Sequence, residues 1–414
     1  MGRRCALLVV LALVSPAAAR AERQQVIGAR PALVDISVDH DGRAFLVSAS
    51  RSAVRLRSAA PGAAFTPGVT LMRDRAVDAA VASDGSGAIA VQSGRRVRVV
   101  TFDARGQAGA PSVVSRGRTA DFAAAAVARD GAAVVVWFRH TRARRWRLEA
   151  AVRDSGAAAF GAPQPLSRFV RRACCTHVSV AIGDRGDAVA AWRSTSDPAL
   201  WTSLRQAGES FRPAQRLAED SSDDPKVAVG EDGTAAVLYS LQRVPLRAGD
   251  GLRLQRAGPG GAFGAPEVVN PGGGVTIGET AITPAGRVLV AWVDHAGARV
   301  RVSESEPGAA LVQSGAIGAG VAPRAVALAA ADDGRAVVAW SQQVGNERSY
   351  SEQSMVAIRL TRPAGFGSPV ALGSPWRVAE PRLARLVPGG GALVAWAGSD
   401  FRPRSTVLAV MRVP

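Results

Sequence analysis

Lysine is almost missing from this chain of 414 residues, and cysteine and aromatic residues are scarce. Lys226 is the only lysine, so arginine carries nearly all of the basic charge, and the formal net charge is +17. Three cysteines are too few for a disulfide-built scaffold. The sequence also has no Ser nucleophile elbow, phosphate-binding loop or HExxH motif, which removes the common signatures of hydrolases, nucleotide-binding proteins and zinc proteases.

No long apolar run is present either, and the one short run lies at the start of the chain. Arg3 and Arg4 precede the apolar stretch Ala6 to Val14, and Ala19-Arg20-Ala21 has the small-x-small pattern of a signal peptidase site. The run is too short to cross a bilayer. We therefore predict a cleaved signal peptide at residues 1–21, no transmembrane segment, and a secreted or periplasmic, cell-envelope location. Export by the general or by the twin-arginine route stays open.

The basic charge predicts attraction to anionic polymers. Possible partners are a glycan, an anionic envelope polymer or another protein; nucleic acid is not expected, because no nucleic-acid-binding motif occurs in a chain destined for export. We expect a monomer without a cofactor.

A repeated pattern occupies the rest of the chain. Each copy has a short apolar run, a polar turn ending in glycine, and a second apolar run that often ends in an aromatic residue. The turn glycines are 43 to 56 residues apart, a spacing typical of four-stranded repeats: Gly42, Gly85, Gly131, Gly186, Gly233, Gly286, Gly334 and Gly390. Six residues after each glycine stand Ser48, Val91, Trp137, Trp192, Tyr239, Trp292, Trp340 and Trp396. Six of these eight are aromatic, which predicts large rings packed between neighbouring sheets.

The hairpin of each repeat reads as continuous small apolar residues, which is typical of strands buried on both faces. An alternating third strand follows, and then a turn and a fourth strand that we expect to carry a proline at the sheet edge. These features predict an all-β propeller at residues 22–414, most simply with eight four-stranded blades. Seven is the alternative, because the first two repeats lack the aromatic. The last repeat is one strand short, and residues Arg23 to Gly28 are predicted to complete it and close the ring.

The hairpin pattern DG-x-A-V-V-A-W resembles that of secreted bacterial β-propeller repeat proteins, including those of sialidase-like architecture. The resemblance implies the propeller fold over nearly the whole mature chain. It does not extend to the Asp-box, S-x-D-x-G-x-x-W, because Asp and Gly are adjacent here, as in Asp130-Gly131 and Asp333-Gly334. Glycosidase activity is therefore not implied.

Ligands of propellers commonly bind where one blade passes into the next, at the mouth of the central channel. The residues at these passages form a mostly acidic set: Asp35, Asp78, Asp121, His177, Asp224, Glu279, Arg324 and Arg382. They lie seven to ten residues before their turn glycines, so they need not share one depth. Such a ring would favour a cation, or a cationic or polyhydroxyl ligand. The alternative is that short polar residues simply begin the strands.

Cys174 and Cys175 are adjacent, and after signal cleavage they are the only cysteines. In an oxidising compartment they can form a vicinal disulfide, because the chain offers no other partner. A soft-metal site or a catalytic Cys-His pair with His177 are the alternatives. The aspartates around Gly42 and Gly334 are interpreted as hairpin turns and not as calcium loops, so we predict no metal site.

The leading functional hypothesis is a secreted, non-enzymatic propeller that binds a ligand or acts as an envelope interaction module. The alternative is a carbohydrate-active enzyme, a glycoside hydrolase or polysaccharide lyase, with an acidic site at the channel mouth. Sialidase chemistry would need an activated tyrosine. The only tyrosines are Tyr239, at an aromatic packing position, and Tyr350, in a polar stretch.

Overall fold

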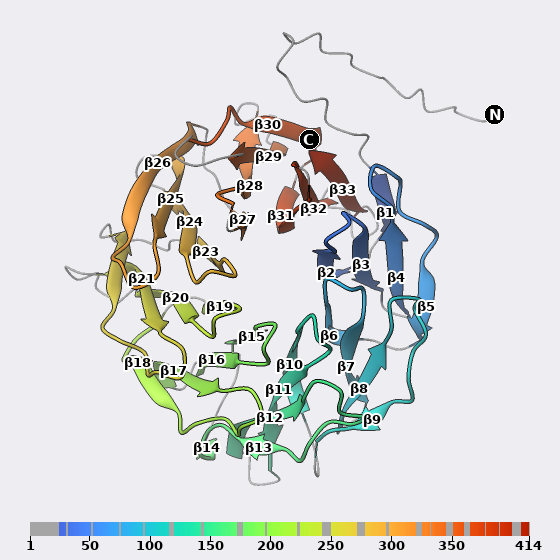
Figure 1. Ribbon diagram of the computed structural model, residues 1–414, viewed down its shortest axis with the longest axis vertical. Helices are drawn as coiled ribbons and strands as arrows, with labels where there is room; N and C mark the ends of the chain where they lie inside the picture. The colour runs from blue at the N-terminus through green and yellow to red at the C-terminus, as the bar shows by residue number, and fades with distance from the viewer. Residues whose placement is uncertain are drawn as a thin grey trace.

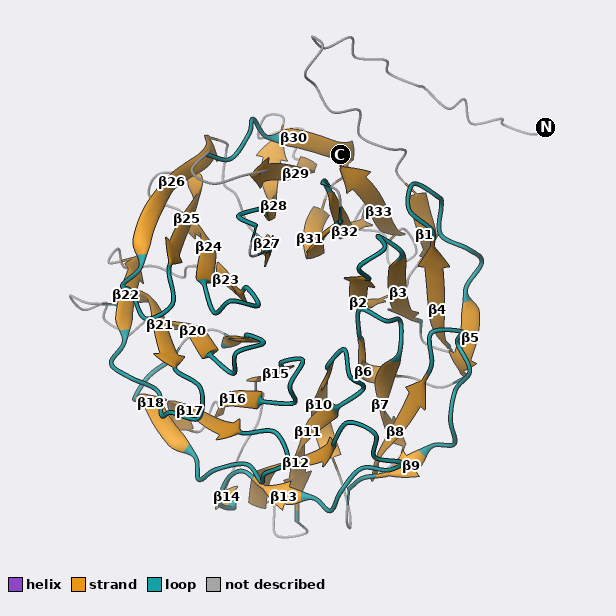
Figure 2. Ribbon diagram, in the orientation of Figure 1, coloured by secondary structure: helices purple, strands orange, loops and turns teal. Residues whose placement is uncertain are grey.

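The structure is a computed structural model. It describes residues 25–413 except 30–31, 51–52, 74–75, 94–95, 116–119, 142–144, 172–176, 195–196, 222–223, 242–249, 271–277, 295–297, 320–324, 332, 345–350, 360–364, 377, 389 and 400–406. Within these residues all regular structure is β-strand, and no helix is long and apolar enough to cross a membrane. The strands form sheets arranged as a ring around a central axis (Figures 1 and 2). The all-β propeller predicted from the sequence is confirmed.

The described strands form eight sheets, one for each turn glycine, and each sheet is a blade. Blade 1 consists of β2 (Ala32–Val38), β3 (Ala44–Ala49), β4 (Val54–Ala59) and β5 (Val69–Met72), and blade 2 of β6 (Ala76–Val81), β7 (Gly87–Ser93), β8 (Arg96–Phe102) and β9 (Ser112–Val113). Blade 3 consists of β10 (Ala120–Val127), β11 (Ala133–His140), β12 (Arg145–Arg153), β13 (Gln164–Pro165) and β14 (Val170–Arg171). Blade 4 consists of β15 (His177–Ile182), β16 (Ala188–Ser194), β17 (Asp197–Arg205) and β18 (Gln215–Ala218).

Blades 5 to 8 continue around the ring. Blade 5 consists of β19 (Lys226–Val229), β20 (Ala235–Leu241), β21 (Gly251–Ala257) and β22 (Glu267–Asn270), and blade 6 of β23 (Gly278–Ile282), β24 (Val288–Asp294), β25 (Arg299–Ser305) and β26 (Val312–Ala319). Blade 7 consists of β27 (Val326–Ala330), β28 (Ala336–Val344), β29 (Ser351–Arg359) and β30 (Val370–Trp376). Blade 8 consists of β31 (Val378–Leu386), β32 (Ala392–Ser399), β33 (Val407–Val413) and β1 (Gln25–Ala29). The strand given first for each blade lies innermost (Figure 1): β2, β6, β10, β15, β19, β23, β27 and β31.

The two ends of the described chain close the ring. Strand β1 pairs antiparallel with β33, with Gln25 opposite Val410 and Ala29 opposite Val407. The N-terminal strand is thus the outermost strand of blade 8, as predicted. This pairing covers an edge of β33 that would otherwise carry unpaired backbone groups.

The hairpins follow the predicted glycine pattern, and the structure shows which type of turn they contain. All eight turn glycines have positive φ, from 81° at Gly42 to 113° at Gly390. Each turn closes with two backbone hydrogen bonds, such as Gly85 N to Ala82 O at 3.0 Å and Ala82 N to Ser86 O at 2.8 Å. These bonds define a three-residue loop with glycine at the left-handed position, a loop length that the sequence pattern had not specified.

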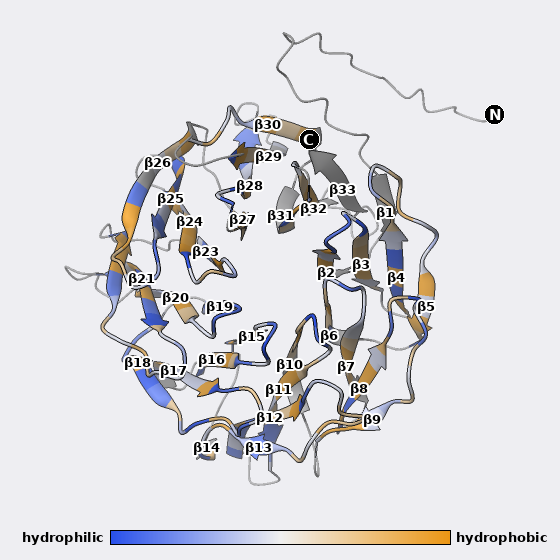
Figure 3. Cartoon of the chain, viewed as in Figure 1, coloured by the Kyte–Doolittle hydropathy of each residue, from blue (hydrophilic) through white to orange (hydrophobic). Residues whose placement is uncertain are grey.

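Hydrophobic packing between blades accounts for the repeated aromatic residue. Trp340 of blade 7 is 2% exposed and packs with Leu289 and Val302 of blade 6. Trp137, Trp192, Tyr239, Trp292 and Trp396 are likewise buried against the preceding blade. Figure 3 shows the corresponding distribution of hydropathy: strands near the axis such as β24 are hydrophobic, and outermost strands such as β18 are hydrophilic.

The five prolines predicted to lie in the outermost strands stand directly before them, although two others, Pro165 and Pro375, lie within β13 and β30. Pro67, Pro163, Pro213, Pro266 and Pro369 precede β5, β13, β18, β22 and β30 by one or two residues. The prediction that the fourth strand itself carries these prolines was therefore wrong in register. Placed before the strand, proline removes no ladder hydrogen bond.

Part of the arginine excess has a structural role. Arg153, Arg205 and Arg359 end the third strands of their blades, and each donates to the carbonyl of its own turn glycine, at 2.7, 2.7 and 2.9 Å. Arg359 is 3% exposed, and its guanidinium also binds both carboxylate oxygens of Glu304 in blade 6, at 3.1 and 3.0 Å. Such arginines hold turns and blades together, so the net charge overstates the freely available basic surface.

Candidate functional site

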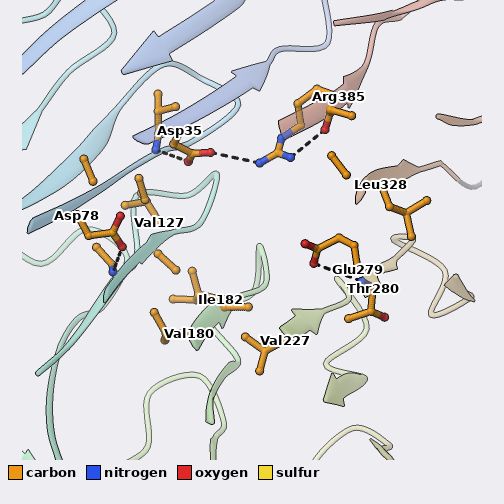
Figure 4. Close-up of a pocket in the computed structure, with 18 residues that line it drawn as sticks. Asp35, Asp78, Val127, Val180, Ile182, Val227, Glu279, Thr280, Leu328 and Arg385 are labelled. Atoms are coloured by element: carbon orange, nitrogen blue, oxygen red, sulfur yellow. Dashed lines mark hydrogen bonds and ion pairs between the residues drawn. The ribbon is translucent and has the colours of Figure 1, made fainter. Parts of the chain in front are cut away.

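A cavity of about 420 Å³ lies on the axis of the ring, and all eight innermost strands contribute to its wall (Figure 4). Its charged lining residues are Asp35, Asp78, Glu279 and Arg385. A volume of this size is within the usual range of small-molecule sites. The cavity is therefore the candidate site within the described part of the chain.

Asp35, in the middle of β2, connects three blades. Its Oδ2 accepts a hydrogen bond from Val81 N of blade 2 at 2.9 Å, and its Oδ1 accepts one from Ile36 N at 2.8 Å. Arg385 Nη2 of blade 8 lies 3.3 Å from the same Oδ1. Burial raises the pKa of Asp35, while Arg385 and the two backbone donors act in the opposite direction.

Asp78 has the same place in blade 2. Its Oδ2 accepts a hydrogen bond from Ala125 N of blade 3 at 2.8 Å. Burial raises the pKa of Asp78 to about 7, and the negative charge of Asp35 adds to this, while backbone donors from Ala125 and Ala79 lower it. At neutral pH this carboxyl group can therefore both donate and accept a proton, unlike an ordinary aspartate.

Glu279 adds a third carboxylate to the cavity, across from Asp78 (Figure 4). It comes from β23 of blade 6, and its Oε2 lies 3.7 Å from Lys226 Nζ of blade 5. Its Oε1 accepts a bond from Thr280 N at 3.3 Å. The side chain of Glu279 is 27% exposed and that of Lys226 is 41% exposed, so this pair is partly solvated and contributes little to stability.

One structural position unites these contacts. The residue seven places before the turn glycine is Asp35, Asp78, Ser179, Lys226 and Glu279 in five of the blades. The first four reach the next blade: Ser179 Oγ, for example, donates to Pro225 O at 2.5 Å. The position therefore serves first as a link between inner strands, and the carboxylates in the cavity are held in place by these links.

The opposite wall of the cavity is aliphatic. Val127, Val180, Ile182 and Val227 line it from blades 3, 4 and 5, and Figure 4 shows Val180, Ile182 and Val227 together on the side away from Asp35 and Arg385. No aromatic side chain is among the lining residues. The aromatic residues of the repeats lie between blades instead.

The structure separates the predicted channel residues into groups. It brings Asp35, Asp78 and Glu279 together in the cavity. His177 and Asp224 form an ion pair, Nδ1 to Oδ1, where β15 and the segment before β19 begin, and they do not line the cavity. Asp121 lies in β10 and Arg382 in β31, but their side chains are outside the description, as are Arg324, Cys174 and Cys175 altogether. The described members of the set thus lie in different places, as their different distances from the turn glycines allowed.

Sequence reasoning missed two cationic residues, Lys226 and Arg385. Lys226 stands at the same seven-residue offset as Asp35 and Asp78, so strict counting from the glycine would have found it. Arg385 stands five residues before Gly390 and has no such signal. Its place beside Asp35 depends on ring closure between blades 8 and 1.

Two further sequence interpretations concern chemistry elsewhere. Asp39 Oδ1 accepts bonds from Asp41 N and Arg43 N, at 2.9 and 2.7 Å, in the manner of a hairpin turn. Among the described residues no group of three or more His, Cys, Asp or Glu is arranged to hold a metal ion. Tyr239 is 2% exposed, donates to Gln255 Oε1 at 2.9 Å, and burial raises its pKa to about 12, so it cannot act as a nucleophile at neutral pH.

Comparison with known proteins identifies the fold. A scan against protein families and a search of curated proteins both find no match. Among solved structures, the Dos1 propeller matches with a TM-score of 0.51 and 8% identity over 95% of this chain and 94% of that one. A structure from a study of two prolyl endopeptidases gives 0.47 and 12% over 91% of this chain, which spans 56% of the endopeptidase. A protein of unknown function from Dyadobacter fermentans gives 0.46 and 10%, over 96% and 100%.

The likeness to the Dos1 propeller, at 8% identity, defines the class of protein by fold alone. The chain is a β-propeller with a polar and aliphatic cavity on its axis.

Proposed function

We propose that this protein is a secreted, non-enzymatic β-propeller that binds a small cationic or polyhydroxyl ligand in its channel cavity. The observation that carries the proposal is the cavity of about 420 Å³ in which carboxylates from blades 1, 2 and 6 meet. Asp35 and Asp78 are oriented by hydrogen bonds from the next blade, so no ordering cost remains for them on binding.

The non-enzymatic assignment is supported by how these carboxylates are used. One oxygen of Asp35 and one of Asp78 accept backbone N–H groups that join neighbouring blades. Export is supported by the apolar stretch Ala6 to Val14 and by the small-x-small site at Ala19 to Ala21. The net charge of +17 supports contact with an anionic envelope polymer.

A second candidate function is a carbohydrate-active enzyme, and one observation favours it. Asp35 and Asp78 line the same cavity and burial raises the pKa of both, and perturbed pKa values are common among catalytic groups. The described part of the lining has no aromatic residue on which a sugar ring could stack, which favours the binding module instead.

The experiment is a glycan array together with thermal-shift measurements on small amines and sugars, using the wild type, Asp78→Asn and Asp84→Asn. Asp84 is an exposed aspartate in the turn of the same blade and serves as the control. A ligand whose binding is lost in Asp78→Asn and kept in Asp84→Asn supports the proposal. Turnover of an array glycan, abolished by Asp78→Asn, would instead establish the enzyme.

A further inference from the structure

The cavity wall is divided into a charged side and an aliphatic side. Asp78, Asp35 and Arg385 form the charged side, from blades 2, 1 and 8, and Val180, Ile182 and Val227 line the other side from blades 4 and 5, with Glu279 of blade 6 next to Val227 (Figure 4). Three carboxyl groups stand against one guanidinium in this wall. The charged side therefore favours a positively charged group, and the aliphatic side favours hydrocarbon.

The composition of the wall narrows the kind of cation. The described residues hold no cluster that suits a metal ion. Quaternary ammonium groups and sugar rings are both recognised on aromatic faces, and none of the described lining residues is aromatic. A primary ammonium group, in contrast, has three N–H donors, which match the oxygens of two adjacent carboxyl groups.

We propose that the channel cavity binds a primary alkylammonium ligand, with its ammonium group at Asp78 and Asp35 and its hydrocarbon body against Val180, Ile182 and Val227. This inference rests on the proposed binding function and deepens it by naming the ligand class. Asp78 is the main charged partner, because Asp35 already lies beside Arg385.

Two features of the wall support this orientation. Asp78 carries a carboxyl group whose ionisation is opposed by burial, and an adjacent ammonium group relieves that cost. The side chains of Val180, Ile182 and Val227 carry no hydrogen-bonding group, so they favour hydrocarbon over a polar group at the far end of the ligand.

The test is isothermal titration calorimetry of the purified full chain at pH 8 with ethylammonium, butylammonium and hexylammonium chloride. The controls for the probe are hexan-1-ol, which lacks the charge, 6-aminohexanoate, which places a carboxylate at the far end, and glucose. Each methylene buried on the aliphatic side is expected to raise the affinity about fourfold. Hexan-1-ol, 6-aminohexanoate and glucose should bind at least about tenfold more weakly than hexylammonium.

The variants are Asp78→Asn, Ile182→Thr and the control Asp84→Asn. Asp78→Asn retains an oxygen that can accept the Ala125 N–H, so it is expected to fold, as circular dichroism and thermal unfolding will show. It should lower hexylammonium affinity by about tenfold or more, and Ile182→Thr should flatten the dependence on chain length. Asp84→Asn should change neither.

The outcomes separate this inference from the proposed function. If glucose or an array glycan binds in an Asp78-dependent manner and the ammonium series does not, the alkylammonium assignment is wrong and the binding function stands. If hexylammonium and hexan-1-ol bind equally, the assignment is also overturned. If no amine, sugar or glycan depends on Asp78, both the assignment and the binding function fall.

Discussion

The raised pKa of Asp78 makes the stability of this propeller depend on pH, and Asp78→Asn should remove that dependence. Burial raises the pKa from 3.8 to about 7 in the folded protein. Below about pH 4 the group is protonated in both the folded and the unfolded state. As the pH rises toward 7, the unfolded chain ionises first, so the folded state becomes progressively less favourable, and the loss is complete once the folded group ionises.

The magnitude follows from the shift. About 3 pKa units at about 1.4 kcal/mol each correspond to about 4 kcal/mol by pH 8. Asparagine is neutral in both states and can still accept the Ala125 N–H. The variant should therefore match the wild type near pH 4 and exceed its free energy of unfolding by up to about 4 kcal/mol at pH 8.

Urea unfolding followed by tryptophan fluorescence, at steps from pH 4 to pH 8, measures this difference. Titrating groups distant from Asp78 are common to both proteins and cancel in the comparison, whereas Asp35 is coupled to Asp78 and contributes to the difference. Asp84→Asn, in the exposed turn of the same blade, should show a difference that does not vary in this way. A constant difference between wild type and Asp78→Asn across the pH range would refute the reasoning, since it would mean that Asp78 is ionised normally.

Four other predictions concern the fold and the cysteines. Trp340→Ala should lower the free energy of unfolding by about 3 to 5 kcal/mol in urea titrations, because the ring fills the space between blades 6 and 7; a loss under about 1 kcal/mol would contradict that role. Arg359→Ala should cost about 3 to 5 kcal/mol in the same assay, as it leaves a buried carboxylate without its ion pair. Deleting Gln25–Ala29 should lower the melting temperature and promote association through the exposed edge of β33, seen by light scattering; an unchanged monomer would argue against ring closure. Mass spectrometry after alkylation should find Cys174 and Cys175 unmodified without reductant, and two alkylated cysteines would exclude the vicinal disulfide.

The propeller could be predicted because its determinants are local and repeated. Gly85 and its counterparts need the left-handed conformation, and Trp340 and its counterparts stand at one fixed distance from them. Both requirements recur in each repeat, so their register is visible in the sequence. The closing strand was predictable for a similar reason: a blade one strand short must obtain its missing partner from the other end of the chain.

The candidate site was predictable only in part. Asp35, Asp78 and Glu279 were identified from their place before each turn, but His177 and Asp224 pair with each other outside the cavity. The difference arises because the offset from the glycine sets how deep a side chain lies along the channel. Residues nine places before the turn begin their strands or precede them, whereas four of the five polar residues seven places before it reach the next blade.

The sequence by itself determined the repeat, the hairpins, the aromatic packing and the ring, because each depends on contacts within a blade or between successive blades. Only the tertiary structure decided what meets on the axis. There eight strands from the whole length of the chain converge, and Asp35 meets Arg385 although 350 residues separate them. Which side of the cavity is charged and which is aliphatic, and how strongly burial perturbs Asp78, follow from that convergence.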